Sequence, residues 1–426
     1  MSGSDELIDY LFSRRRFGLK PGLQRVQALL EYLGHPERKF EVIHIAGTNG
    51  KGTTAAFLEG ILRAGGLRTG LYTSPHLVSP EERVRVNWAK IPRERLVGWI
   101  ADLRPQIERT EATFFEAMTA IGLAYFAETG VDVAVVEVGL GGRWDATNVV
   151  VPRVSVVTDV HLDHQRHLGR TLSEIAAEKA GILKPGVPCV TYVQRYVARI
   201  VLEQKAREVG AELLRLQAEA HTRVRRVEAS GTTVDYRGRE LHLRGMRTRL
   251  VGEHQGRNLA LALLSAEVYG LPGDLSEETL RGAVAAVRWD GRFQVLTQNP
   301  LRLVDVAHNI QGVRAFVDTF QWVWGEGPNT VLVLGLLRDK PASGMFETLA
   351  RLGRRVVVTP LPSQRSADAE TLAALARERG WEVQLASSPV EAWQLAEDWA
   401  GNDPVVGLGS HYLVGDVLRL QGVPPV

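Results

Sequence analysis

A glycine-rich turn that carries a lysine lies between a strand-like and a helix-like stretch. Residues 40–46 (FEVIHIA) predict a buried strand, and Thr53–Arg63 predicts a helix. The turn consists of Gly47, Thr48, Asn49, Gly50, Lys51, Gly52 and Thr53. In such an arrangement backbone N–H groups and the helix dipole converge on phosphate oxygens, and Lys51 can reach the terminal phosphates. The turn therefore predicts a nucleotide phosphate site, although Ile45 and Gly52 depart from the usual P-loop spacing.

Two further strand-like stretches end in acidic residues. Glu137 closes a β-branched run and is followed by Gly139 and Gly141. A carboxylate at the end of a strand, beside a glycine turn, is suitably placed to bind Mg²⁺. The other stretch runs into residues 159–164 (DVHLDH), which contain two Asp and two His. These residue types could form a metal site, a charge-relay cluster or a polar loop with capping Asp residues.

The elements that must position these residues alternate along the chain. Short β-branched runs alternate with amphipathic stretches, a pattern typical of a mostly parallel sheet flanked by helices. Strands are predicted at Glu41–Ala46, Val131–Val138, Val154–Val160, Val187–Val193, Arg302–Ala307, Thr330–Leu336, Arg355–Thr359 and Pro404–Leu408. Helices are predicted at Thr53–Arg63, Phe115–Glu128, Leu172–Ile182 and Asn258–Tyr269. Residues 223–243 alternate with turn residues instead and predict a small antiparallel segment.

A polar, proline-containing stretch, residues 297–300 (TQNP), separates two series of strands and helices. Such stretches often mark domain boundaries. We therefore expect a large domain over residues 1–296 and a smaller one over residues 297–426.

The composition is that of a globular protein with little net charge. The 51 basic and 49 acidic residues give +2 at pH 7, which predicts no nucleic-acid partner. No run approaches the roughly 18 apolar residues of a membrane span. A single cysteine, Cys189, excludes an internal disulfide framework and a cysteine-based zinc site. We expect a cytoplasmic monomer that binds small molecules and no membrane.

The phosphate loop resembles that of the Mur ligase superfamily. Its ending, Lys51-Gly52-Thr53, is similar to the folylpolyglutamate synthase and dihydrofolate synthase branch. Residues 135–148 (VVEVGLGGRWDATN) resemble the second signature of that family. The resemblance implies an α/β fold, in which a P-loop-containing, mostly parallel sheet forms an ATPase domain and a smaller Rossmann-like α/β domain follows as the glutamate ligase domain.

The same resemblance implies roles for individual residues. Those implied for catalysis are Lys51, Glu137, His164, Lys179 and Arg292. Those implied to ligate one or two Mg²⁺ ions are Ser74, Glu137 and His164. Nucleotide contacts are implied for the phosphate loop and for Gln255, Asn258, Arg292, Asp305 and His308. Substrate contacts are implied for Phe115, Glu116, Asp145 and Ser410.

Two of these implications have plain alternatives. Lys179 is implied to be carbamylated by CO₂ and to offer an anionic oxygen near the metals, but it could also be a surface lysine that suits a helix C-terminus. Near Asp305 the family usually has Gly and Pro where this chain has Val306 and Ile310. The resemblance at this loop therefore concerns its side chains and not its backbone shape.

Together these features predict an ATP-dependent carboxylate–amine ligase. A substrate carboxylate would attack the γ-phosphate of ATP, and L-glutamate would then open the acyl phosphate. The acceptor is dihydropteroate, a folate such as tetrahydrofolate, or both, and the sequence does not separate these substrates. The alternatives are another Mur-type amide ligase of cell-wall or polymer metabolism, a regulatory P-loop NTPase, and a binding module without catalysis.

Overall fold

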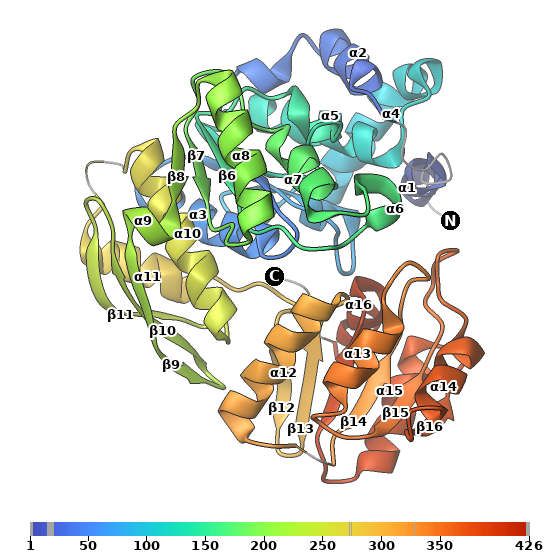
Figure 1. The fold of residues 1–426 in the computed structure, drawn as a ribbon. Coiled ribbons are helices and arrows are strands. Elements are labelled where there is room, and N and C mark those ends of the chain that lie inside the picture. The colour runs from blue at the N-terminus through green and yellow to red at the C-terminus, as the bar shows by residue number, and fades with distance from the viewer. Residues whose placement is uncertain (1–2, 15–20, 272, 274, 328, 423–426) are drawn as a thin grey trace. The chain divides into compact units, whose positions relative to one another are not determined.

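The chain divides into two compact units, each built around its own sheet (Figure 1). The structure is a computed structural model that describes residues 3–14, 21–271, 273, 275–327 and 329–422. The first unit comprises Met1–Thr222, Asp235–Arg244 and Arg257–Ala286, and the second comprises Arg223–Val234, Gly245–Gly256 and Val287–Val426. The chain therefore passes between the units several times before it completes the second one.

The sheet of the first unit has eight strands in the order β4-β3-β2-β5-β1-β6-β7-β8. Neighbours from β2 to β8 are parallel, whereas β3 and β4 form an antiparallel edge. The strands are β1 Glu41–Ala46, β2 Thr69–Tyr72, β3 Val84–Val86, β4 Ala89–Lys90, β5 Val133–Glu137, β6 Val154–Val157, β7 Cys189–Thr191 and β8 Leu213–Arg215. Every residue of β5 is buried, as expected of a parallel strand that helices cover on both faces.

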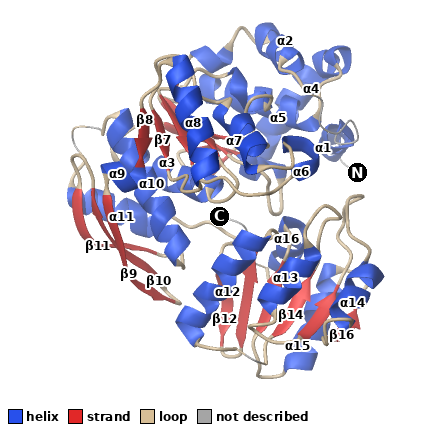
Figure 2. Ribbon diagram, in the orientation of Figure 1, coloured by secondary structure: helices blue, strands red, loops and turns tan. Residues whose placement is uncertain are grey.

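Helices flank this sheet (Figure 2). They are α1 Gly3–Ser13, α2 Gln24–Tyr32, α3 Lys51–Ala64, α4 Arg93–Thr110, α5 Phe114–Glu128, α6 Gln165–Leu168, α7 Leu172–Ala180, α8 Tyr196–Val209, α9 Leu216–Glu219, α10 Glu253–Tyr269 and α11 Glu277–Ala286. α3 packs on β1, β2 and β5, and α7 packs against α8. Apolar side chains of α2, α4 and α5 form one core, and those of α7 and α8 form another with β6 and β7.

A three-stranded sheet in the order β11-β10-β9 lies where the chain passes between the units. Its strands are β9 His221–Glu228, β10 Gly231–Arg237 and β11 His242–Thr248. Only two residues join β9 to β10, and a connection that short can join only antiparallel neighbours. The predicted antiparallel segment over residues 223–243 is therefore confirmed.

The sheet of the second unit has the order β12-β13-β17-β14-β15-β16. Its strands are β12 Gln294–Gln298, β13 Leu301–Asp305, β14 Val331–Leu334, β15 Arg355–Val358, β16 Glu382–Leu385 and β17 Val405–Leu408. Its helices are α12 Ile310–Trp324, α13 Ala342–Leu349, α14 Ala369–Arg377, α15 Pro389–Ala400 and α16 His411–Leu420. α12, α13 and α14 pack in a row, and α15 packs against α16. The chain moves across the sheet in one direction from β13 to β16 and returns in the other from β16 to β17. Because such crossovers are right-handed, the two helix groups cover opposite faces of the sheet.

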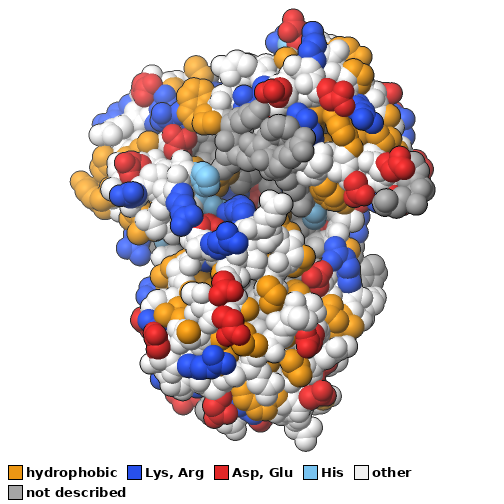
Figure 3. Space-filling view, turned by 90° about the vertical axis from the view of Figure 1, so that its right-hand side faces the viewer, with side chains coloured by type: hydrophobic (Ala, Val, Ile, Leu, Met, Phe, Trp, Pro, Cys, Tyr) orange, Lys and Arg blue, Asp and Glu red, His pale blue; other side chains and the backbone are white. Residues whose placement is uncertain are grey.

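The predicted α/β fold with a mostly parallel sheet and a second, smaller sheet is confirmed. Residues 297–300 comprise the end of β12 and the two-residue turn of the antiparallel β12–β13 hairpin, within the second unit. The domain boundary between residues 296 and 297 stays a prediction. No helix in the described part of the chain is long and apolar enough to cross a membrane. On the face in Figure 3, acidic and basic side chains are interspersed, in keeping with the small net charge.

Candidate active site

Four neighbouring parallel strands of the first unit end at one edge of its sheet, in the spatial order β2, β5, β1, β6. Their register pairs Glu137 with Ile45 and Ala46 with Val157. The phosphate loop, the turn after Glu137 and residues 158–164 therefore begin at the same level. β1 continues through α3 towards β2, whereas β6 continues through α7 towards β7. This edge is thus a topological switch point, the usual place for ligands in open α/β sheets.

The phosphate loop turns through two glycines with positive φ, 152° at Gly47 and 82° at Gly50. Gly50 precedes α3 and has no side chain with which to cap the first N–H groups of that helix. A Cβ at Gly47 would lie 1.8 Å from Thr158 Oγ1, and one at Gly50 would lie 2.5 Å from Asn258 Oδ1. The structure thus brings Asn258 onto the phosphate loop, and the helix N-terminus there is suited to bind phosphate.

Lys51 and Glu137 face each other at this edge, with 3.9 Å between Nζ and Oε1. Glu137 is only 4% exposed, and its Oε2 accepts the backbone N–H of Ser74 at 3.0 Å. A carboxylate and a serine at the ends of adjacent strands supply the hard oxygen ligands that Mg²⁺ prefers. These residues therefore fit the predicted metal, with Lys51 beside them to meet phosphate oxygens.

His164 is the residue immediately before α6 and has φ 50°. Its N–H donates to Asp163 Oδ1 at 2.8 Å, and its Nε2 lies 4.0 Å from Asp163 Oδ2. Within the described ranges, no group of three or more His, Cys, Asp and Glu side chains could hold a metal ion. The metal role of His164, with Ser74 and Glu137, stays a prediction.

Lys179 lies near the end of α7, but its side chain is not on the surface. It is 3% exposed, and its Nζ donates to the carbonyl oxygen of Gly47 at 2.8 Å. Burial lowers the pKa of Lys179 to about 7, and the nearby charge of Lys51 acts in the same direction. Three carboxylates oppose this shift: Asp159, Asp163 and Asp145. The alternative of a surface lysine is therefore wrong, and a large fraction of this amine is neutral near pH 7.

Phe115 and Asp145, two of the predicted substrate residues, lie at the glycine turn after β5. A Cβ on Gly139 would lie 2.4 Å from Phe115 Cζ, so the ring rests against the backbone of the turn. Asp145 accepts the N–H of Leu140 at 2.8 Å and that of Thr147 at 3.0 Å. Burial raises the pKa of Asp145, and these hydrogen bonds act against the shift.

Glu116, the third predicted substrate residue of the first unit, makes its contacts within the fold. Its Oε2 accepts the N–H of Thr113 at 2.7 Å, which closes a capping box at the start of α5. Its Oε1 accepts from Arg25 Nε at 2.9 Å. Both carboxylate oxygens are therefore engaged, and the substrate role of Glu116 stays a prediction.

The predicted residues of the second unit gather where its neighbouring strands β13 and β17 end. The helices that follow these strands, α12 and α16, cover opposite faces, so this edge is the switch point of the second sheet. Asp305 accepts the N–H groups of Phe293 and Ala307 at 2.7 Å each. Burial raises the pKa of Asp305, and the charge of Arg292 opposes the shift.

His308 and Ser410 complete this second group. The His308 ring lies 5.7 Å from that of His411, a residue for which the sequence predicted no role. Ser410 caps α16 by accepting the N–H of Tyr412 at 3.1 Å. Gln255 is buried in α10 and belongs to the second unit, whereas Asn258 of the same helix belongs to the first.

Asp159 and His161 also lie at the site, although no definite role was predicted for either. Asp159 Oδ1 accepts the N–H of Thr48 at 3.1 Å and that of Asn49 at 2.8 Å. His161 Nε2 lies 3.3 Å from Asp159 Oδ2. Both residues follow β6 closely, much as Glu137 ends β5, and this position at a strand end is the signal that could have singled them out.

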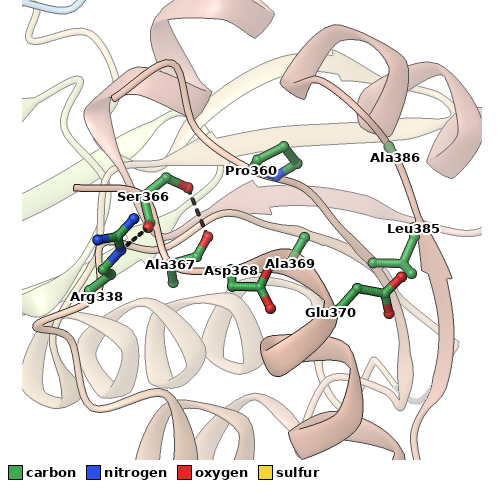
Figure 4. Close-up of a pocket in the computed structure, with 9 residues that line it drawn as sticks. All are labelled: Arg338, Pro360, Ser366, Ala367, Asp368, Ala369, Glu370, Leu385 and Ala386. Atoms are coloured by element: carbon green, nitrogen blue, oxygen red, sulfur yellow. Dashed lines mark hydrogen bonds between the residues drawn. The ribbon is translucent and has the colours of Figure 1, made fainter. Parts of the chain in front are cut away.

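A cavity of about 390 Å³ lies elsewhere in the second unit, where β15 and β16 end (Figure 4). It is lined by Arg338, Pro360, Ser366, Ala367, Asp368, Ala369, Glu370, Leu385 and Ala386. Arg338 Nε donates to Ser366 O at 2.8 Å, and Asp368 caps α14. None of these lining residues was predicted to act in binding or catalysis, so we assign the cavity no function.

Two family profiles match the chain. Residues 45–266 match the Mur ligase middle domain, and residues 291–411 match the Mur ligase glutamate ligase domain. The dihydrofolate synthase/folylpolyglutamate synthase of Bacillus subtilis is 33% identical over 96% of this chain and 97% of that protein. The folylpolyglutamate synthase of Lacticaseibacillus casei is 35% identical over 97% of both chains.

Solved structures resemble the whole chain. The folylpolyglutamate synthase of Mycobacterium tuberculosis, in complex with ADP, matches with a TM-score of 0.93 and 33% identity over 99% of both chains. Escherichia coli FolC, in complex with DHPP and ADP, matches with a TM-score of 0.87 and 31% identity over 97% of both chains. The similarity therefore extends over both units.

Proposed function

The chain belongs to the dihydrofolate synthase/folylpolyglutamate synthase family of Mur ligases, and we propose that it is an ATP-dependent ligase that joins L-glutamate to dihydropteroate, to tetrahydrofolate or to both. The observation that carries this proposal is the meeting of Lys51, Glu137 and the phosphate loop at the switch point of the first sheet. Relatives similar over the full chain and solved with ADP support ATP as the nucleotide substrate.

The proposed reaction has two steps. A carboxylate oxygen of the pterin substrate attacks the γ-phosphorus of ATP, the bond to the β-phosphate oxygen breaks, and ADP leaves. The glutamate amine then attacks the acyl carbon, the bond from that carbon to the phosphate oxygen breaks, and phosphate leaves as the amine loses its proton. Lys51 at the start of α3 stabilises the negative charge that develops on the transferred phosphoryl group.

Ser74, Glu137 and His164 are the residues proposed to hold Mg²⁺. When bound, the cation would neutralise charge on the phosphate oxygens of the nucleotide. Glu137 supports this assignment best, because its carboxylate is buried yet lies 3.9 Å from the Lys51 amine. Its hydrogen bond from Ser74 fixes the carboxylate at the strand edge.

Lys179 is proposed to be carbamylated. Its neutral amine would attack CO₂ and release one proton to give a carbamate, and this reaction requires an amine whose pKa is low enough for the free base to be present. Burial provides that condition by lowering the pKa to about 7. The carbamate nitrogen keeps one N–H, which can still donate to the Gly47 carbonyl that the amine contacts at 2.8 Å.

The remaining residues are proposed binding contacts. Gln255, Asn258, Arg292, Asp305 and His308 would contact the nucleotide, and Phe115, Glu116, Asp145 and Ser410 would contact the other substrates. Phe115 and Asp145 have the stronger support in the first unit, because they share the glycine turn beside Glu137. A cytoplasmic, monomeric enzyme remains our prediction.

The proposal is tested by measuring ADP release from Mg-ATP and L-glutamate, with dihydropteroate or tetrahydrofolate added separately and the products identified by mass. Turnover with both acceptors would establish a bifunctional synthase, and turnover with one would assign the narrower activity. If neither acceptor raised ADP release and no glutamate adduct formed, the folate assignment would be wrong. ATP hydrolysis without any acceptor would then favour a regulatory NTPase.

A further inference from the structure

The segment after β6 holds the start of the phosphate loop through several hydrogen bonds. Asp159 Oδ1 accepts the N–H groups of Thr48 and Asn49 at 3.1 and 2.8 Å. The backbone N–H of His161 donates to Thr48 Oγ1 at 3.0 Å, and Thr158 Oγ1 donates to Asn49 O at 2.7 Å. The N–H groups of both loop residues and the Thr48 hydroxyl are therefore engaged within the protein.

Successive backbone N–H groups that point at one atom form an anion site. At Thr48 and Asn49 a carboxylate of the protein already occupies that site. The first N–H groups of an α-helix, in contrast, have no acceptor within the helix. A phosphate that enters the loop is therefore directed onward to the start of α3, where Lys51 lies 3.9 Å from Glu137.

We propose that Asp159 is a positioning residue of the nucleotide site, which preforms the phosphate loop and keeps phosphate out of its first turn. His161 supports Asp159 through its ring, 3.3 Å from the second carboxylate oxygen, and through its backbone contact with Thr48. This inference rests on the proposed function for the identity of its ligand, a nucleoside triphosphate.

The position of the two segments explains why this contact forms. β1 and β6 are adjacent and parallel, and the pairing of Ala46 with Val157 brings both following loops to the same level. Thr158 then donates its N–H to Ala46 O at 2.9 Å. Gly47 passes so close to Thr158 that a Cβ on Gly47 would lie 1.8 Å from the threonine hydroxyl.

On its carbonyl side the phosphate loop is held by Lys179. Lys179 interacts electrostatically with Asp159, and its Nζ donates to Gly47 O at 2.8 Å. The loop is thus held by an anion on its N–H groups and by an amine on its carbonyl. Hydrogen bonds to a charged acceptor are stronger than neutral ones and can fix a glycine-rich backbone that would otherwise sample many conformations.

The test measures binding of ADP with Mg²⁺ to the full chain by calorimetry. Asp159→Ala removes both side-chain hydrogen bonds to the loop but keeps the backbone one from the Thr48 N–H to Asp159 O at 3.0 Å, and it is expected to weaken ADP binding about 100-fold. Asp159→Asn keeps an oxygen that can accept from the same two N–H groups and is expected to weaken binding only about threefold. His161→Ala leaves both Asp159 bonds in place and is also expected to have a small effect, about threefold.

Asp132→Ala is the matched control, because Asp132 also accepts a backbone N–H, that of Arg68 at 2.7 Å, but away from the loop. It is expected to leave ADP binding unchanged. The KM for ATP should rise in Asp159→Ala while the KM for the pterin substrate and for glutamate stays constant.

Three outcomes would overturn the inference. In the first, Asp159→Ala binds ADP as tightly as the wild type. In the second, Asp159→Asn binds ADP as weakly as Asp159→Ala, and the effect would then come from the charge of Asp159 and not from loop geometry. If Asp159→Ala fails to fold, the test rests on the other two variants. A 100-fold loss of ADP affinity in Asp159→Asn, together with wild-type affinity in a folded His161→Ala, would then overturn the inference. A wild-type protein that binds ADP but forms no glutamate adduct would refute the proposed function and leave the inference standing.

Discussion

The two units place helix N-termini at the switch points of their sheets but treat the first N–H groups differently. In the first unit α3 follows Gly50, which has no side chain to cap it. In the second unit Asn309 caps α12 by accepting the N–H of Gly312 at 2.8 Å, and Ser410 caps α16. The first edge therefore leaves the first N–H groups of its helix without a side-chain cap, whereas at the second edge a side chain accepts one N–H of each helix.

The charged side chains differ in the same sense. The first edge collects buried or half-buried Lys51, Lys179 and Glu137 around a glycine loop, and the second offers His308 and His411 beside the capped helices. A polyphosphate needs several donors and positive charge at once, which the first edge supplies. The second edge offers individual side chains instead, of which His308 is proposed to contact the nucleotide and Ser410 another substrate.

The largest effect is expected from the charge at the uncapped helix. Lys51→Ala removes the ammonium group 3.9 Å from Glu137 and should lower kcat for ADP release about 100- to 1,000-fold, because stabilisation of the transferred phosphoryl group is lost. Lys205→Ala is the control, since Lys205 lies on α8 and pairs with Glu208. Unchanged turnover in Lys51→Ala would show that the first edge does not carry the chemistry.

Backbone geometry should matter next. Gly47→Ala places a Cβ 1.8 Å from Thr158 Oγ1, so the loop must shift and the KM for ATP should rise about 10- to 100-fold. Gly312→Ala in the second unit meets its nearest atom at 3.2 Å and lies in a helix that alanine favours, so its effect should be small. Steady-state kinetics on both variants measures the contrast.

A second substitution can separate crowding from a general loss of folding. Thr158→Ala removes the hydroxyl that a Cβ at Gly47 would strike. The double variant Gly47→Ala, Thr158→Ala should therefore recover part of the ATP affinity. No recovery, with both proteins folded by circular dichroism, would assign the effect to the positive φ of Gly47 and not to the contact.

The third prediction concerns pH. The folded-state pKa of Lys179 is about 7, below its usual value, so the neutral amine is lost as pH falls through 7. At a constant concentration of dissolved CO₂, the initial rate of carbamylation should decrease about tenfold per pH unit below 7 and level off above it, because it follows the fraction of neutral amine. ¹³C-labelled CO₂ followed by NMR measures the adduct, and Lys184→Ala, which removes another partly buried lysine, serves as the control. A carbamate signal that persists in Lys179→Ala would refute the assignment.

The same group affects stability in a definite direction. Between pH 7 and the usual pKa of a lysine, the unfolded chain binds a proton at Lys179 that the folded chain does not. The unmodified protein should therefore gain stability as pH rises through this window.

The sequence predicted local elements well and spatial partners less well. The bounds of β1 were predicted correctly, because a continuous apolar run ends at a glycine turn. β2 and β16 were missed: each has four residues, β2 contains a glycine, and β16 is only half-buried. Neither carries a strong enough pattern to be recognised without its neighbours.

The site shows the same limit. Glu137 was found because it ends a strand beside glycines, a local feature. The contact of Asp159 with Thr48 and Asn49 depends on β6 lying next to β1, and this order is not written in the residues near either strand. The burial of Lys179 likewise follows from a contact with Gly47, 132 residues away along the chain.

The smallest effects should come from the side chains that cap helices of the second unit. Ser410→Ala and Asp368→Ala each remove a side chain that caps a helix of the second unit, with N–H···O distances of 3.1 and 2.8 Å. Each should lower the free energy of unfolding by about 1 kcal/mol. Only Ser410 lies at the switch point, so only Ser410→Ala should also raise the KM for glutamate, while Asp368→Ala should leave it unchanged. Equal KM values for glutamate in the two variants would show that Ser410 acts only as a helix cap. The second edge would then take no part in substrate recognition.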